Sequence, residues 1–127
     1  MTDLVARARE AMRNAYAPYS KFRVGAAIEG MDGRVFAGCN VESASYGLTI
    51  CAERMAIGAG VVGGAKAFRR IAVTTEVEPP AAPCGACRQL LAEFGLDLEV
   101  IGAGPKSERR WSLRELLPDA FTSASLT

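Results

Sequence analysis

The 127-residue chain contains no histidine, and this absence restricts the chemistry that it can perform. Histidine is the commonest metal ligand in proteins and the side chain that most readily exchanges protons near neutral pH. Any metal site in this chain must therefore use thiolates or carboxylates. Any general acid or base must be Glu, Asp, Lys or Tyr.

Long apolar runs and an excess of basic charge are also missing. No stretch approaches the roughly 18 to 20 apolar residues of a membrane span, and an N-terminus carrying Asp3 and Arg7 lacks the apolar core of a signal peptide. Fifteen basic and fourteen acidic residues give a net charge of +1, which is not typical of a nucleic-acid-binding protein. The densest basic stretch, residues 106–114, is interrupted by Glu108 and is predicted to be solvated surface. We therefore expect a cytoplasmic protein with a small-molecule substrate, no nucleic-acid partner and no membrane partner.

The chain length fits a single domain, residues 1–127. Hydrophobic spacing predicts an amphipathic helix over residues 3–15 and a β-hairpin from residues 22–30 and 34–42. The remaining expected elements are helices over 51–62 and 85–94, strands over 70–75 and 97–102, and a short helix between Ser112 and Pro118. Helices and strands alternate after the hairpin, which predicts a three-layer α/β/α sandwich with a mixed β-sheet.

The four cysteines are Cys39, Cys51, Cys84 and Cys87, and three of them occupy predicted helix starts. The N-terminus of a helix favours the thiolate form of cysteine, which is the form that binds metals. Cys84 and Cys87 are separated by three positions and therefore face one side of the first helical turn. With Cys51 they make three ligands, the number commonly found in catalytic zinc sites, which keep a fourth position for water.

Glu53 is the candidate general acid and base of this site. Residues two apart in the middle of a helix do not share a face, so Glu53 and Cys51 can converge only on the first turn. Three thiolates around one Zn²⁺ carry a net charge of −1, and Arg54 is the natural cation to offset it. The sequence therefore indicates metal-assisted hydrolysis with a glutamate moving the protons.

These motifs, taken in order, resemble the homotetrameric zinc-dependent cytidine deaminases of the cytidine and deoxycytidylate deaminase superfamily. Zinc deaminases combine a metal ligand, any residue and Glu with a later Pro-Cys-x-x-Cys, as this chain does in residues 51–53 and 83–87. The resemblance also covers the segments 19–27 (YSKFRVGAA), 38–42 (GCNVE), 44–47 (ASYG) and 116–118 (LLP). A single C-x-x-C is a weak signal, whereas the ordered set is highly specific.

The resemblance implies an enzyme of pyrimidine salvage that hydrolyses cytidine, and also 2′-deoxycytidine, to the uracil nucleoside and ammonia. One Zn²⁺ per chain would be bound by Cys51, Cys84 and Cys87. Glu53 would take a proton from the attacking water, deliver one to ring N3 and protonate the departing amine. Arg54 would hydrogen-bond the ligand sulfurs. Independently of the resemblance, Gln89 is expected to support the start of the helix over residues 85–94.

The same resemblance implies the substrate contacts. Asn40 and Glu42 would hold the ribose hydroxyls, and their spacing of two on a predicted strand places both side chains on one face. Phe22 would stack against the pyrimidine. Further expected contacts are Ala52, Ala44 and Tyr46, the last two near a neighbouring subunit's site, and Phe121, which would cover one. The resemblance also implies a homotetramer with sites shared between subunits.

Other interpretations of the same residues remain open. Cys84 and Cys87 could form a redox dithiol, or Cys39 could be the fourth ligand of a structural zinc in an interaction module without catalysis. An isolated buried thiol is the favoured reading of Cys39. Phe22 could be an ordinary core residue and Phe121 a C-terminal anchor. Among enzymes, the alternative is a deaminase of another aminopyrimidine nucleoside.

Overall fold

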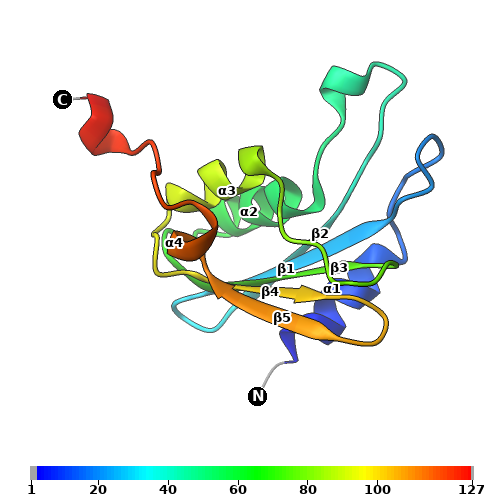
Figure 1. The fold of residues 1–127 in the computed structure, drawn as a ribbon, viewed down its shortest axis with the longest axis horizontal. Helices are drawn as coiled ribbons and strands as arrows, with labels where there is room; N and C mark the ends of the chain where they lie inside the picture. Colours follow the sequence, from blue (N-terminus) through cyan, green and yellow to red (C-terminus); the bar gives the residue numbers. More distant parts are fainter. Residues whose placement is uncertain (1–2, 127) are drawn as a thin grey trace.

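A computed structural model describes residues 3–126 of the chain (Figure 1). Within these residues a five-stranded sheet has the order β2-β1-β3-β4-β5. The strands are β1 (Val24–Gly30), β2 (Val35–Cys39), β3 (Phe68–Thr75), β4 (Glu99–Ala103) and β5 (Glu108–Ser112). Strands β3 and β4 are parallel, and all other neighbours in the sheet are antiparallel. A parallel pair requires a long crossover connection, and this connection contains Cys84 and Cys87, two of the candidate metal ligands.

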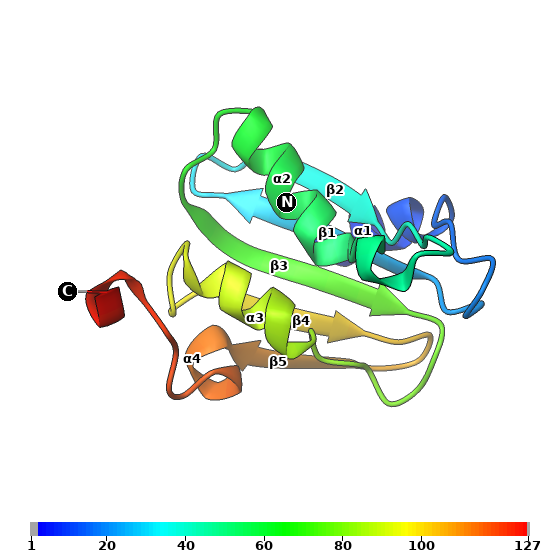
Figure 2. The ribbon, with the colours of Figure 1, turned by 90° about the horizontal axis from the view of Figure 1, so that it is seen from above.

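Helices cover both faces of the sheet (Figures 1 and 2). Helix α1 (Leu4–Met12) lies on one face, and α2 (Ala52–Val62) and α3 (Gly85–Ala92) lie side by side on the other. The short helix α4 (Leu113–Leu116) follows β5, and two 3₁₀ helices, η1 (Tyr46–Leu48) and η2 (Ser123–Leu126), lie in the connections. The predicted three-layer arrangement with a mixed sheet is confirmed. No helix among the described residues is both long and apolar enough to cross a membrane.

Two hydrophobic clusters occupy the two sides of the sheet. Strand β1 contributes Ala26 and Ile28 to the cluster under α2 and α3, and Ala27 to the cluster under α1. This alternation follows from the period of two along a strand. Ile57 of α2 and Leu91 of α3 lie in the first cluster, so the helices that carry the cysteines are fixed to the sheet by buried apolar side chains.

Gly38 allows helix α2 to begin directly against the sheet. It lies on β2 opposite Ala26, and a Cβ atom at this position would lie 2.6 Å from the carbonyl oxygen of Ala52 and 2.6 Å from the amide nitrogen of Ala56. Only glycine permits such an approach between a strand and the backbone of a helix. The first turn of α2, which carries the proposed metal and proton-transfer residues, is therefore held close to β2.

Some sequence predictions were wrong in detail. The fifth strand was missed because its residues, ERRWS, do not alternate between apolar and polar side chains. Within residues 3–126 it is an edge strand that pairs only with β4, and charged side chains are common on such edges. The basic residues 106–110 are exposed, as predicted. The helical pattern of residues 85–94 predicts that Leu90 faces inward, but this residue is 36% exposed. Helix α1 ends at Met12 instead of continuing to residue 15.

Candidate active site

The structure brings together the three cysteines that the sequence identified. Cys51 is the N-cap of α2, Cys84 is the N-cap of α3, and Cys87 lies in the first turn of α3. Their Sγ atoms all lie within 4.8 Å of one another. Val41 and Ile50 form an antiparallel bridge that closes the preceding loop and directs the chain into Cys51.

The three sulfurs fit a zinc ion. A tetrahedral Zn²⁺ with Zn–S bonds of about 2.3 Å places its sulfurs about 3.8 Å apart, so the cluster needs only a small contraction. Burial alone would raise the pKa of the Cys84 thiol, but hydrogen bonds from the Cys87 and Ala86 amides and from the Cys87 side chain hold it below its usual value. Burial, followed by the charges of Glu53 and Cys51, raises the pKa of the buried Cys87. A divalent cation acts in the opposite direction and deprotonates coordinating thiols.

Cys39 does not belong to this group. It lies at the end of β2 and lines a different cavity, between α1, β2 and α2, beside Arg7 and Met55. The cluster within residues 3–126 comprises Cys51, Cys84 and Cys87. This arrangement favours three sulfur ligands over a closed site with four.

A cavity of about 240 Å³ adjoins the sulfurs. It is lined by Phe22, Val24, Asn40, Thr49, Cys51, Ala52, Glu53, Val73, Thr75, Ala81, Ala82 and Cys84. The contributions of β3 and of the loop after it were not anticipated from the sequence. The one available signal was that residues 70–75 form a strand leading into the metal-binding loop, because ligands commonly bind at the carboxyl ends of strands in open α/β sheets.

Glu53 lies in the cavity with only 6% of its surface exposed. Burial raises the pKa of this carboxyl, while its own backbone amide, the Cys87 thiol and the charge of Arg54 act against the rise. A carboxyl whose pKa is raised toward neutrality can both accept and donate a proton. Arg54 itself donates a hydrogen bond to the Thr49 carbonyl at 2.8 Å, and its Nη2 lies 3.9 Å from the Cys51 sulfur.

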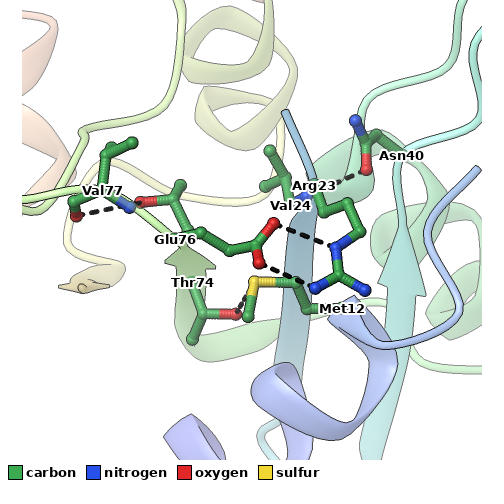
Figure 3. Close-up of polar contacts among 8 residues, drawn as sticks. Met12, Arg23, Val24, Asn40, Thr74, Glu76 and Val77 are labelled. Atoms are coloured by element: carbon green, nitrogen blue, oxygen red, sulfur yellow. Dashed lines mark hydrogen bonds and ion pairs between the residues drawn. The ribbon is translucent and has the colours of Figure 1, made fainter. Parts of the chain in front are cut away.

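Asn40 forms two side-chain hydrogen bonds in the wall of the cavity, and Figure 3 shows the one to Val24. The residue is 8% exposed. Its side chain accepts a hydrogen bond from the Val24 amide at 2.9 Å and donates one to the Phe22 carbonyl at 2.8 Å. Next to it, the Arg23 guanidinium binds the Glu76 carboxylate through two hydrogen bonds of 2.9 and 2.7 Å. These contacts fix the start of β1, and with it Phe22, against the end of β3.

Glu42 lies in an adjoining cavity with Tyr19, Ser20, Tyr46 and Thr49. Its carboxylate accepts hydrogen bonds from the amides of Tyr19 and Ser20, at 3.0 and 3.1 Å, and from the Ser20 hydroxyl. The expectation that Asn40 and Glu42 share one strand face was wrong, because β2 ends at Cys39. The two residues instead line neighbouring cavities that have Thr49 in common.

Of the remaining predicted residues, Ala52 lines the cavity beside the thiols, Tyr46 lines the Glu42 cavity, and Ala44, Gln89 and Phe121 line neither. Ala44 and Tyr46 lie on the exposed loop that contains η1, and the Tyr46 residue is 76% exposed. Phe121 is 58% exposed. Gln89 donates a hydrogen bond to the Phe121 carbonyl at 2.5 Å, so its amide contacts the C-terminal segment and connects α3 to it. Ala52 is fully buried and lines the cavity.

Three thiols at two helix N-termini, a buried carboxyl beside them and an α/β/α sandwich define the zinc-dependent deaminase class of hydrolases. Residues 1–103 match the profile of the family described as "Cytidine and deoxycytidylate deaminase zinc-binding region". The chain belongs to this family, so the sequence resemblance and the zinc cofactor that it implied are confirmed.

Relatives across nearly the whole chain agree with this assignment. The chain is 41% identical to the cytidine deaminase of Sporosarcina psychrophila over 126 residues, which covers 98% of this chain and 93% of the relative. It is 43% identical to the cytidine deaminase of Halalkalibacterium halodurans over 125 residues, 97% of this chain and 95% of the relative. The crystal structure of cytidine deaminase from Burkholderia pseudomallei superimposes with a TM-score of 0.91 at 50% identity, covering 95% of this chain and 100% of that one.

Proposed function

We propose that the chain, as one domain over residues 1–127, is a zinc-dependent hydrolase that converts cytidine and 2′-deoxycytidine to uridine or deoxyuridine and ammonia. The observation that carries this proposal is the position of Glu53. A buried carboxyl lines the same cavity as the Cys51 and Cys84 thiols, which a purely structural metal site does not require. The names of the relatives support the nucleoside as substrate.

Cys51, Cys84 and Cys87 would hold the Zn²⁺, which supplies an activated water and Lewis-acid stabilisation when bound. Glu53 would take a proton from the attacking water and deliver protons to ring N3 and to the departing amine. Phe22, which lies just before β1, provides an apolar wall for the pyrimidine ring. The low exposure of Glu53 keeps bulk water away from the proton that it transfers.

The sugar would bind where the two cavities adjoin. The Asn40 amide retains one N–H and one lone pair beyond its two hydrogen bonds, and the Glu42 carboxylate has more acceptor sites than its three hydrogen bonds use. Both side chains can therefore contact ribose hydroxyls without breaking the bonds that hold them. We assign them the sugar end of the substrate.

The proposal includes a homotetramer in which Ala44, Tyr46 and Phe121 contribute to a neighbour's site. It is supported by their exposure on their own chain. Analytical ultracentrifugation should give about four times the chain mass of 13.4 kDa, and a monomer that is fully active would contradict shared sites. The same proposal includes a role in pyrimidine salvage and a cytoplasmic location. The location agrees with the three reduced thiols that the site needs, because thiols remain reduced in the cytoplasm.

The test is incubation of the purified protein with cytidine while the absorbance loss, the ammonia released and the bound zinc are measured together. We expect equimolar uridine and ammonia and one zinc per chain. Chelation should abolish turnover, and re-addition of zinc should restore it. Bound zinc without turnover of cytidine, or turnover only of another aminopyrimidine nucleoside assayed in parallel, would refute the proposal.

A further inference from the structure

Ser20 lies between the two ends of the proposed nucleoside site. Its hydroxyl donates a hydrogen bond to one Glu42 carboxylate oxygen and accepts a hydrogen bond from the Phe22 amide at 3.0 Å. The Ser20 amide donates to the other oxygen of the same carboxylate at 3.1 Å. A single short side chain therefore contacts the residue assigned to the sugar and the residue assigned to the base.

The backbone around Ser20 is held in an uncommon conformation. Lys21, between Ser20 and Phe22, has φ of 62°, in the left-handed region that non-glycine residues rarely adopt. Such a conformation persists where surrounding contacts maintain it. Here the Ser20 hydroxyl bonds to the amide on the far side of Lys21, and the Lys21 amide bonds to the Ala17 carbonyl at 3.1 Å.

Phe22 is fixed on both of its backbone polar groups. Its amide is bound by Ser20, and its carbonyl is bound by Asn40. The Phe22 side chain lines the cavity beside the thiols, and Glu42 lines the adjoining cavity. Loss of the Ser20 hydroxyl would therefore remove one hydrogen bond from each of the two cavity walls at once.

We propose that Ser20 is a positioning residue that fixes Glu42 and Phe22 relative to each other, so that sugar and base are bound in register with the metal centre. This inference rests on the proposed function, which assigns Glu42 to the sugar. The Ser20 hydroxyl is also the largest cause of the lowered pKa of Glu42, in agreement with an ionised carboxylate oriented by its donors.

The test compares steady-state kinetics of the wild type, Ser20→Ala, Ser20→Thr and Ser107→Ala. Ser20 is exposed, so neither alanine nor the added methyl group of threonine disturbs packing. The Ser107 hydroxyl donates to the Glu78 carboxylate at 2.5 Å on an exposed loop, which makes Ser107→Ala a matched control outside the site. Zinc content and the midpoint of thermal unfolding are measured for every variant.

We expect Ser20→Ala to lower kcat/KM for cytidine about tenfold, the range of one hydrogen bond to a charged group, mostly through KM. Ser20→Thr should restore the wild-type value to within about threefold, and Ser107→Ala should leave it unchanged, because the hydroxyl is the operative group. With 2′,3′-dideoxycytidine, which lacks the hydroxyls proposed to meet Glu42, the effect of Ser20→Ala should shrink to about threefold or less.

The outcomes separate the two proposals. Wild-type protein without cytidine turnover refutes the proposed function and the role of Ser20 with it. An active wild type and an equally active, zinc-loaded Ser20→Ala variant overturn the role of Ser20 alone. Equal losses with cytidine and dideoxycytidine overturn the connection to Glu42, and a loss that Ser20→Thr does not reverse overturns the role of the hydroxyl.

Discussion

Replacement of Glu53 by glutamine tests the proton-transfer step with almost no change in shape. Glu53 lies in the first turn of α2 and is 6% exposed. Glutamine keeps the volume of the side chain and one carbonyl oxygen, but it cannot accept or release a proton at neutral pH. Any loss of activity in a folded, zinc-loaded variant therefore reports on proton transfer.

The expected loss is large because one carboxyl serves several transfers. A single positioned acid–base group contributes roughly 10²- to 10⁴-fold to a rate. Among residues 3–126, Glu53 is the one carboxylate lining the cavity beside the sulfurs, so another acid cannot readily replace it. We expect kcat to fall by about 10³-fold or more, which corresponds to about 4 kcal/mol in activation free energy.

The Glu53→Gln substitution should lower activity but should leave thermal stability unchanged or raise it. Burial raises the pKa of Glu53, which means that the folded state disfavours the ionised carboxylate. Without the metal, the contribution of Glu53 to the free energy of unfolding is greatest at low pH. It is lost as the pH rises through the raised folded-state pKa. A neutral amide removes this penalty, so the variant should unfold at the same temperature as the wild type or higher at pH 7.

The assay is the initial rate of absorbance loss with cytidine, with zinc measured by atomic emission on the same sample. Glu115→Gln is a matched control, because Glu115 is also a first-turn glutamate, in the capping box of α4, and glutamine is accepted in that motif. Its activity should equal that of the wild type. A Glu53→Gln variant that binds zinc and retains activity within about tenfold of the wild type would refute this mechanism.

Four further substitutions test the surroundings of the site. Arg54→Ala should weaken zinc retention against a chelator by about tenfold or more, because the guanidinium lies 3.9 Å from the Cys51 sulfur. Unchanged zinc binding and activity in this variant would show that the charge of Arg54 is not needed. Cys39→Ala should keep one zinc per chain and full activity, and loss of zinc would indicate a fourth ligand. Gly38→Ala should lower the free energy of unfolding by about 1–3 kcal/mol because a Cβ atom would overlap the α2 backbone. Gly58→Ala, on α2 with nothing within 4 Å of the added atom, should raise it by about 0.5–1 kcal/mol in the same urea titration.

The proposed metal ligands could be identified in the sequence because their placement on the helices depends on local rules. Cys84 and Cys87 share the first turn of α3, and Cys51 caps α2; the C-x-x-C spacing and the helix-start pattern are visible in the sequence. That α2 and α3 bring their first turns to one point depends on packing against the sheet, which spacing does not reveal. The meeting of the two helix starts could be predicted only from the number of candidate ligands and from the family resemblance.

Asn40 shows where the local rules failed. Its predicted place on a strand assigned it the same face as Glu42, but β2 ends one residue earlier, and Val41 bridges to Tyr16 and Ile50 instead. The Asn40 side chain then takes over the role of the sheet ladder by bonding the Phe22 carbonyl and the Val24 amide. Side-chain bonds to a distant backbone have no periodic signature in a sequence, so they could not be anticipated.

The missing histidine becomes understandable from the positions of the helices. Three thiolates and a divalent cation sum to a charge of −1, and an ionised Glu53 adds another negative charge. Helices α2 and α3 begin at Cys51 and Cys84, and each N-terminus presents about half a positive elementary charge to the site. Arg54 adds a full positive charge beside one sulfur. These charges together offset about two negative ones, so an all-sulfur centre needs no neutral imidazole ligand to keep the metal electrophilic.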